Sequence, residues 1–256
     1  MKRTRPSSRS KLSRAPIDQF PGNSSGNKLL MALLQKDRNY ILERCQFVDF
    51  RKHFLVHEID TPIKFCYFIT GGLASILSVM SSGKSVEVGL VGREGFIGLP
   101  ATAGFATSPT RVVMQVEGNA FRISAADLKE CLHKSAALEL ALTRFSQTLT
   151  LQATQIAACN RVHEVDQRLA RWLLMSLDRL GGNSVPLTQD SLASMLGTRR
   201  ASVTVAAGIL QKAGLITYRR GDVRIDNRER LERAACECYE TLKRQNAKWD
   251  SETERV

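Results

Sequence analysis

The segment from Leu187 to Ile216, LTQDSLASMLGTRRASVTVAAGILQKAGLI, decides the fold of this chain, because its spacing fits two short helices joined by a turn. Thr188 predicts the start of the first helix, since a threonine hydroxyl accepts hydrogen bonds from the free N–H groups there. Gly197 predicts the tight turn, because glycine takes positive φ without a Cβ clash. Residues recur at helical spacing in both helices: Leu192, Met195 and Leu196 in the first, and Val203, Ala206, Ile209 and Leu210 in the second. The segment therefore predicts a helix-turn-helix.

A basic β-hairpin is predicted directly after these helices. Residues 215–218 and 223–225 read as strands, and Arg219-Arg220-Gly221-Asp222 as the tight turn between them. An ordinary pair of packed helices is the alternative, but a helix-turn-helix followed by such a hairpin is a winged helix. The second helix opens with basic and hydroxyl side chains, which suit the edges of bases in a major groove. We therefore expect double-stranded DNA to be bound by Thr188, Arg199, Arg200, Ser202, Thr204, Arg219 and Arg220.

The composition agrees with a nucleic-acid partner. The chain has 256 residues, which is enough for two domains, and a formal net charge of +12, which favours polyanions. No apolar run approaches the roughly 20 residues of a membrane span, so we expect a cytoplasmic protein with no membrane association.

The cysteines give a weak signal. Six of them are scattered along the chain with no C-x-x-C pair, a poor pattern for disulfides, zinc or an iron–sulfur cluster. We expect reduced, mostly buried thiols and no metal, and the sequence names no cofactor. Cys236-Glu237-Cys238 alone leaves a metal or redox alternative.

The first half of the chain predicts a tail and a strand-rich domain. Residues 1–26 are rich in Ser, Pro, Gly, Lys and Arg, which predicts a disordered basic tail, with an organellar transit peptide as the alternative. A helical piece is expected at about 27–42. From 45 to 123, short strands alternate with turns such as Thr70-Gly71-Gly72. This pattern predicts an α+β fold with an antiparallel β-roll or barrel as the domain over residues 27–134.

A long helix is predicted next, at about 125–158, with a break near Asn160-Arg161. Its residues Leu138, Leu142, Phe145, Leu149, Gln152 and Ile156 recur at alternating steps of four and three, a seam typical of a coiled coil. We expect a homodimer interface formed by Leu138, Leu142, Phe145, Leu149 and Ile156, although a helix packed on its own domain gives the same pattern. The expected division is a dimerisation helix at 135–160, a winged helix-turn-helix at 161–240 and a charged tail at 241–256.

A β-roll, a long dimer helix and a C-terminal winged helix-turn-helix, in that order, resemble the CRP/FNR superfamily of bacterial transcription regulators. The resemblance covers about residues 40–240. It rests on Val91-Gly92-Arg93-Glu94-Gly95-Phe96-Ile97-Gly98, on QRLARWLL at 167–174 and on 187–216. It implies a homodimeric transcription regulator with a sensor domain, and DNA and RNA polymerase as partners. Arg200 matches the family's first base-reading residue, but Ala201 and Val205 replace the other two, so we expect a different target sequence.

The resemblance breaks at the residues that would hold a cyclic nucleotide. Leu99-Pro100 stands where cyclic-nucleotide-binding members have a glutamate for the ribose, and Ser108-Pro109 where they have an arginine–serine pair for the phosphate. Each lost charge-assisted hydrogen bond would cost about 1.5–3 kcal/mol. Glycine amides and a nearby cation are the remaining candidates for effector binding: Gly92, Gly95, Gly98 and Arg111. We therefore do not expect cyclic AMP as the ligand, and the sequence leaves the effector unknown.

Two other classes of function are open. An enzyme is disfavoured because the chain has no Walker A loop, G-x-S-x-G motif or evident pair of carboxylates, and His163-Glu164 lacks the second histidine of a zinc-protease motif. A ligand-sensing protein that acts through protein partners is the other alternative, and the basic hairpin argues against it.

Overall fold

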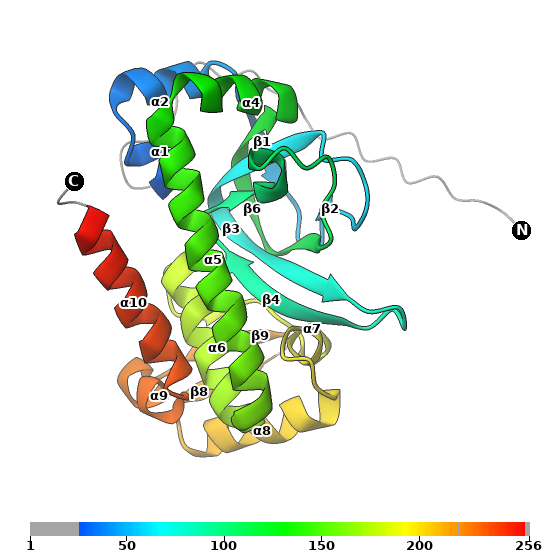
Figure 1. The fold of residues 1–256 in the computed structure, drawn as a ribbon. Helices are drawn as coiled ribbons and strands as arrows, with labels where there is room; N and C mark the ends of the chain where they lie inside the picture. Colours follow the sequence, from blue (N-terminus) through cyan, green and yellow to red (C-terminus); the bar gives the residue numbers. More distant parts are fainter. Residues whose placement is uncertain (1–25, 220, 254–256) are drawn as a thin grey trace, which may run out of the picture.

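The computed structural model describes residues 26–219 and 221–253. Arg220 and the predicted basic tail, apart from Gly26, lie outside these residues. Figure 1 shows a strand-rich N-terminal half, one long central helix and a helical C-terminal half. The predicted α+β class is confirmed. Among the described helices, none is both long and apolar enough to cross a membrane.

Antiparallel strands form the N-terminal sheet. β1, β6, β3 and β4 lie side by side in that order, while β2 pairs with β6 and β5 pairs with β3. Their bounds are Gln46–Phe50 (β1), Leu55–His57 (β2), Phe65–Val79 (β3), Ser85–Val91 (β4), Phe96–Ile97 (β5) and Arg111–Ser124 (β6). The antiparallel architecture predicted for this region is thus confirmed.

The two longest strands run through glycines, in one case where the sequence predicted a turn. The turn predicted at Thr70-Gly71-Gly72 is wrong, because β3 continues through it, and β6 likewise continues through Gly118. Gly72 has a φ of +83°, and a Cβ on Gly118 would lie 2.0 Å from the carbonyl oxygen of Gly71. These glycines therefore let the backbones of β3 and β6 approach each other closely. The pairing register of the two strands shifts at the same place.

The helices around the roll are shorter than predicted. α1 (Lys28–Met31) and α2 (Gln35–Leu42) replace the single helix expected at 27–42, and a short α3 (Leu99–Thr102) follows β5. α4 (Ala125–Lys134) and α5 (Ala136–Val162) replace the one expected at 125–158. The break falls at Ser135, whose backbone is extended and whose hydroxyl accepts a hydrogen bond from the N–H of Leu138.

The junction between α5 and α6 (Val165–Leu180) lies later than the predicted break at Asn160-Arg161. His163 and Glu164 have extended backbones, and the side chains of Glu164 and Gln167 form a reciprocal capping box at the start of α6. Because this arrangement satisfies two free N–H groups, it fixes the turn at residues 163–164.

The C-terminal half contains the predicted helices and hairpin. α7 (Gln189–Met195) and α8 (Arg200–Lys212) precede β8 (Ile216–Arg219) and β9 (Asp222–Ile225), which β7 (Ser184–Val185) joins in a three-stranded sheet. Two helices follow, α9 (Arg228–Ala234) and α10 (Cys238–Thr253). The charged segment predicted as a tail at 241–256 is helical as far as Thr253, because α10 continues to that residue and packs beside α5 and α6 (Figure 1).

Two apolar cores hold these parts together. The first lies within the roll, where Phe68 and Phe96 are fully buried, and is closed by α1, α2, α4 and part of α5. The second is shared between the two halves, because Leu73, Leu77 and Leu90 of the sheet pack with α6 and the winged helix. The winged helix is therefore docked directly on the sensor sheet.

Candidate DNA-binding interface and sensor cavity

The helix-turn-helix has the geometry that its sequence predicts. The hydroxyl of Thr188 accepts a hydrogen bond of 3.2 Å from the N–H of Ser191 at the start of α7, and Gly197 has a φ of +58° in the turn. The first helix buries Leu192, Met195 and Leu196, as expected. On α8 the buried stripe is Val203, Ala206, Ala207 and Leu210.

Ile209 does not belong to this buried stripe, which corrects the sequence-based assignment. Its side chain is 49% exposed, and Val205 on the same helix is 64% exposed. The inward face of α8 is centred on the two alanines at 206 and 207, so Ile209 projects to the other side. Apolar side chains on this outer face are able to contact the methyl group of thymine. Sequence reasoning placed Ile209 in the core because apolar spacing alone does not fix the centre of a stripe.

The outer face of α8 also carries the predicted polar residues. Arg199 and Arg200 are exposed at the start of the helix, and Arg200 forms an ion pair of 3.4 Å with Asp190 of α7. Thr204 is exposed and donates a hydrogen bond of 2.8 Å to the side chain of Gln189, while Ser202 is half-buried. Exposed pairs of this kind are worth little in water, so DNA can displace them at small cost.

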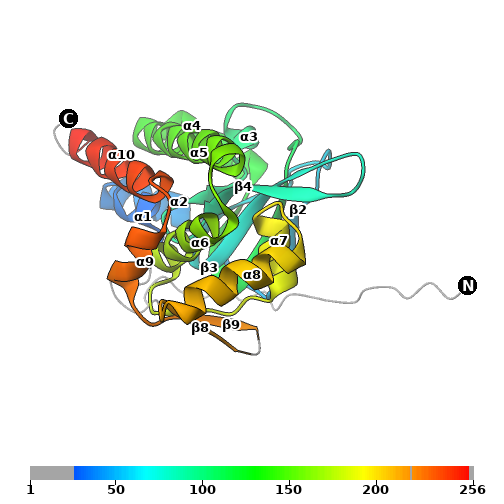
Figure 2. The same ribbon diagram turned by 90° about the horizontal axis from the view of Figure 1, so that it is seen from below.

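The hairpin lies beside this helix, since β8 packs against α8 (Figure 2). Arg219 is exposed at the end of β8, and Arg224 on β9 is exposed and paired with Asp226 at 2.9 Å. The hydroxyl of Tyr218 donates to the carbonyl oxygen of Leu187, which ties the hairpin to the start of the helix-turn-helix. The hairpin thus presents basic side chains next to α8.

The sensor domain contains a small, largely apolar cavity of about 160 Å³. Ligand pockets usually measure about 300–1,000 Å³, so this one is too small for a nucleotide. Residues of the sheet, of α3 and of the long helix line it, among them His57, Phe96, Gly98, Ser108, Val112 and Leu149. Burial lowers the pKa of His57, whose Nε2 lies 2.9 Å from the carbonyl oxygen of Phe65.

The four predicted effector-binding residues are not brought together. Only Gly98 of this group lines the cavity. A Cβ on Gly92 would lie 2.7 Å from the Cβ of Arg179, so Gly92 serves close packing against α6. Gly95 packs against α5 in the same way. The guanidinium of Arg111 is paired with Glu58 at 2.9 Å. An anion cradle is therefore not assembled in this conformation.

The predicted dimer seam on α5 faces the chain's own sheet, which corrects the assignment made from the spacing. The side chains of Leu138, Leu142, Phe145 and Ile156 are at most 5% exposed within the single chain. Leu149 packs against the same core. Gln152 shows the reason most clearly, because its amide accepts from the N–H of Leu90 at 2.8 Å and donates to the carbonyl oxygen of Leu90 at 3.3 Å. Within the single chain, the regular seam therefore covers the sheet at β4.

A cluster of metal-binding side chain types forms at the end of α5, where the sequence predicted none. Cys159, His163, Cys236 and Cys238 converge there. Sequence reasoning missed the cluster because two of these residues lie more than 70 positions after the other two. The only local signals were the four-residue spacing of Cys159 and His163 and the C-x-C pair.

The comparisons with known proteins agree with this architecture. Residues 47–135 match the family of the cyclic nucleotide-binding domain, and residues 167–234 match the Crp-like helix-turn-helix domain; together these ranges make up more than half of the chain. No curated protein sequence gives a significant match.

Solved structures of CRP/FNR-type proteins share the fold. FixK2 from Bradyrhizobium japonicum is 15% identical, with a TM-score of 0.65 over 75% of this chain and 98% of that one. A putative crp/fnr regulator from Eubacterium rectale is 18% identical, with a TM-score of 0.63 over 81% and 97%. CLP, a c-di-GMP-responsive regulator from Xanthomonas campestris, is 18% identical, with a TM-score of 0.62 over 74% and 98%. A cyclic nucleotide-binding-like domain, a long helix and a Crp-like helix-turn-helix in one chain place this protein in the CRP/FNR superfamily of transcription regulators.

Proposed function

We propose that this regulator binds a specific double-stranded DNA site as a homodimer, with α8 in the major groove. The outer face of α8 supports this proposal: it exposes Arg199, Arg200 and Val205 beside a basic hairpin. The early arginines of such a helix are in position to read guanine, whose O6 and N7 accept a bidentate pair. Arg219, and Arg220 after it in the sequence, would contact phosphates, which fix the position of the protein but carry no sequence information.

The dimer interface is proposed on the outward face of α5. The spacing there also follows steps of three and four, as in a coiled coil. The hydroxyls of Thr150 and Thr154 donate hydrogen bonds of 2.9 Å to carbonyl oxygens of their own helix, which leaves their methyl groups free to pack. This outer stripe consists of Leu140, Thr143, Gln147, Thr150, Thr154 and Ala157, all of them exposed in the single chain.

A dimer is favoured because two copies of α8 would then meet two half-sites of a palindromic operator. Half-sites about 34–36 Å apart, one turn of DNA, suit a two-fold symmetric protein. The chain would then consist of three functional units: the sensor domain over 27–134, the long helix from 135 and the winged helix from 161. RNA polymerase would be the partner through which bound protein acts on transcription in the cytoplasm.

The effector is proposed to be a small molecule other than cyclic AMP. The sensor cavity is small and largely apolar, and the guanidinium of Arg111 is held by Glu58 outside it. A cyclic nucleotide would lack a cation for its phosphate and the space for its base.

Gel-shift assays with genomic fragments test the proposal. We expect discrete complexes on a few fragments at nanomolar protein, and weak, salt-sensitive binding elsewhere. Uniform binding to all fragments would mean that the basic surface binds DNA without sequence specificity, which would contradict the proposal. The absence of binding would favour a regulator that acts through protein partners.

A further inference from the structure

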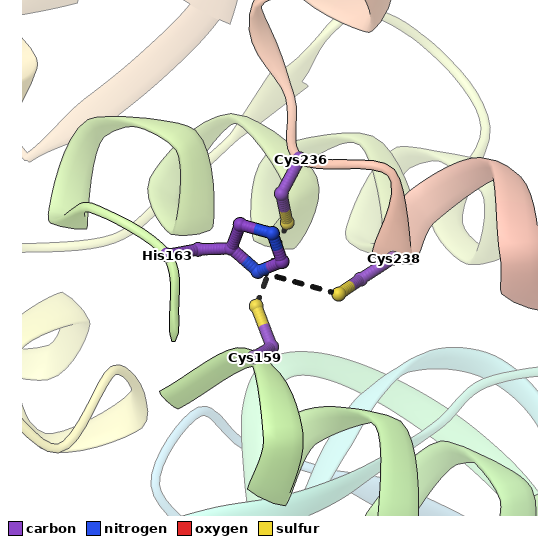
Figure 3. Close-up of side chains that lie close together, drawn as sticks. All are labelled: Cys159, His163, Cys236 and Cys238. Carbon is purple, nitrogen blue, oxygen red and sulfur yellow. Dashed lines mark hydrogen bonds between the residues drawn. The ribbon is translucent and has the colours of Figure 1, made fainter. Parts of the chain in front are cut away.

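Three cysteines and a histidine meet at the joint between the long helix and the DNA-binding half (Figure 3). Cys159 lies in the last turn of α5, His163 in the turn before α6, and Cys236 and Cys238 at the start of α10. The two sulfurs of Cys159 and Cys236 are 3.5 Å apart, and Nδ1 of His163 is 3.5 Å from the sulfur of Cys238. All four donor atoms lie within 4.8 Å of one another.

These separations suit one tetrahedral metal ion. Zinc–sulfur bonds of about 2.3 Å and zinc–nitrogen bonds of about 2.0 Å place neighbouring ligand atoms of a tetrahedron about 3.5–3.8 Å apart. An iron–sulfur cluster spreads its ligands farther, because they are divided among two or more iron ions instead of meeting at one. Three cysteines and one histidine are also a ligand set of structural zinc sites, in which protein atoms fill all four positions.

The second ring nitrogen of the histidine has the partner that a metal ligand needs. Nε2 of His163 lies 2.9 Å from a carboxylate oxygen of Glu237, between the two cysteines of the C-x-C pair. Zinc-bound histidines commonly donate this N–H to a carboxylate, which fixes the ring and its tautomer. The amide of Gln155 donates to the sulfur of Cys238 at 3.1 Å, which stabilises a thiolate there.

Two buried arginines balance the charge of such a site. Three thiolates and Zn²⁺ sum to one negative charge, which is costly to bury without a nearby cation. Arg168 and Arg171 are 7% and 2% exposed, and the Nε of each has no hydrogen-bond partner. Both lie in the first two turns of α6, directly after the turn that carries His163. These cations therefore lie where a negatively charged metal–thiolate group would need them.

The site is closed but reachable. The three cysteines are at most 3% exposed, while the side chain of His163 is 12% exposed and Glu237 is largely in solvent. An ion could enter on the histidine side. With all four positions taken by protein atoms, a water has no room to bind, so the site would have a structural role and not a catalytic one.

We propose that Cys159, His163, Cys236 and Cys238 bind one Zn²⁺ ion per chain. The ion joins the end of the long helix, the turn into α6 and the linker before α10. Bound metal therefore fixes the DNA-binding half relative to the helix that carries the outer stripe. A plain apolar contact among three thiols is the simpler alternative, and a disulfide between Cys159 and Cys236 is the other.

Metal binding by the full-length protein tests the proposal. Wild-type protein, reduced and stripped with a chelator, is titrated with Zn²⁺ alone and then with Co²⁺ as a spectroscopic probe. We expect one ion per chain and the intense visible absorption of a tetrahedral cobalt–thiolate complex. We also expect zinc to raise the melting temperature. None of these measurements needs a variant.

Variants then assign the ligands. Cys159→Ser and Cys236→Ser should abolish stoichiometric binding, while Cys131→Ser, at a buried thiol in α4, is the matched control and should keep it. Glu237→Gln should keep the stoichiometry but weaken affinity about 10–100-fold, as expected for a group that orients a ligand. Far-UV circular dichroism checks that each variant is folded.

Three results would overturn the proposal. One is wild-type protein that binds no more zinc than Cys236→Ser and gives no tetrahedral cobalt spectrum. Another is iron with acid-labile sulfide in place of zinc, which would mean a cluster. The third is a disulfide between Cys159 and Cys236 that persists in protein purified under reducing conditions.

Discussion

The indole nitrogen of Trp172 on α6 donates a hydrogen bond of 2.7 Å to a carboxylate oxygen of Glu87, which lies on strand β4 of the sensor sheet. The other oxygen of Glu87 accepts from the hydroxyl of Ser75. Glu87 is 2% exposed, and burial raises the pKa of its carboxyl group to about 7. An ionisable group thus sits in the core that joins the sensor domain to the DNA-binding half.

The first prediction concerns the pH dependence that this carboxyl confers. Its pKa is raised from an ordinary value of 4.5 to about 7, so between these values the folded protein holds more protons than the unfolded chain. Stability should therefore fall as pH rises from about 4.5 through 7, by up to about 3 kcal/mol. Glu87→Gln, which stays neutral, should flatten this part of the profile in urea unfolding at pH 5–8.

Glu117→Gln, at an exposed carboxyl on the same sheet, is the control and should keep the wild-type profile. If Glu87→Gln keeps the wild-type slope as well, Glu87 is not the titrating group.

The second prediction places the dimer interface on the outer stripe of α5. Thr150→Arg and Thr154→Arg should each weaken association, because two large cations would meet across the two-fold axis. Sedimentation at micromolar concentration should show monomer for both variants and dimer for wild type. Gln35→Arg adds the same charge at an exposed helical position on α2 and should remain dimeric. If both threonine variants remain dimeric, the outer stripe of α5 does not form the dimer interface.

The third prediction uses two glycines with opposite surroundings. A Cβ on Gly95 would lie 2.4 Å from the Cζ of Phe145, so Gly95→Ala should lower the free energy of unfolding by about 1–3 kcal/mol. Gly208 in α8 has nothing within 4 Å of such a Cβ, and Gly208→Ala should raise it by about 0.5–1 kcal/mol. Urea unfolding of both variants, of Phe145→Leu and of Gly95→Ala/Phe145→Leu measures this. The double variant should lose less than the sum of its two single variants, and purely additive losses would show that Phe145 is not the obstacle.

The fourth prediction concerns the effector. Cyclic AMP should leave both the melting temperature and the DNA affinity unchanged at micromolar concentrations, because its phosphate would find no free cation among the residues lining the cavity. Calorimetry measures this directly. A low-micromolar dissociation constant would mean that the cavity opens and that Arg111 leaves Glu58.

The sequence predicted the architecture well because its strongest signals are local. Thr188 and Gly197 mark a cap and a turn that depend on neighbouring residues, and both take the predicted geometry. The failures are relations between distant segments. The seam of Leu138, Leu142 and Phe145 has the same spacing whether it faces a partner or its own sheet, so periodicity could not decide between them.

The sequence likewise could not predict which polar side chains are buried. Alternation in β4 gives no sign that Glu87 meets a tryptophan 85 residues later. The cysteine and histidine cluster likewise depends on α10 turning back beside α5. Both the buried carboxyl of Glu87 and the cysteine and histidine cluster arise only when segments far apart in the sequence pack together.

Sequence recognition by α8 is tested by the affinity of wild type, Arg200→Ala and Arg219→Ala for a duplex selected from random DNA and for its scrambled form, each measured across a salt series. Selection by wild type should yield a two-fold symmetric site. Arg200→Ala should lose about 1–3 kcal/mol on that site, with little loss on scrambled DNA and a relaxed preference at one base. Arg219→Ala should weaken both complexes alike and lower the salt slope by about 1. An equal loss on both duplexes for Arg200→Ala, or no enriched sequence at all, would contradict sequence recognition by α8.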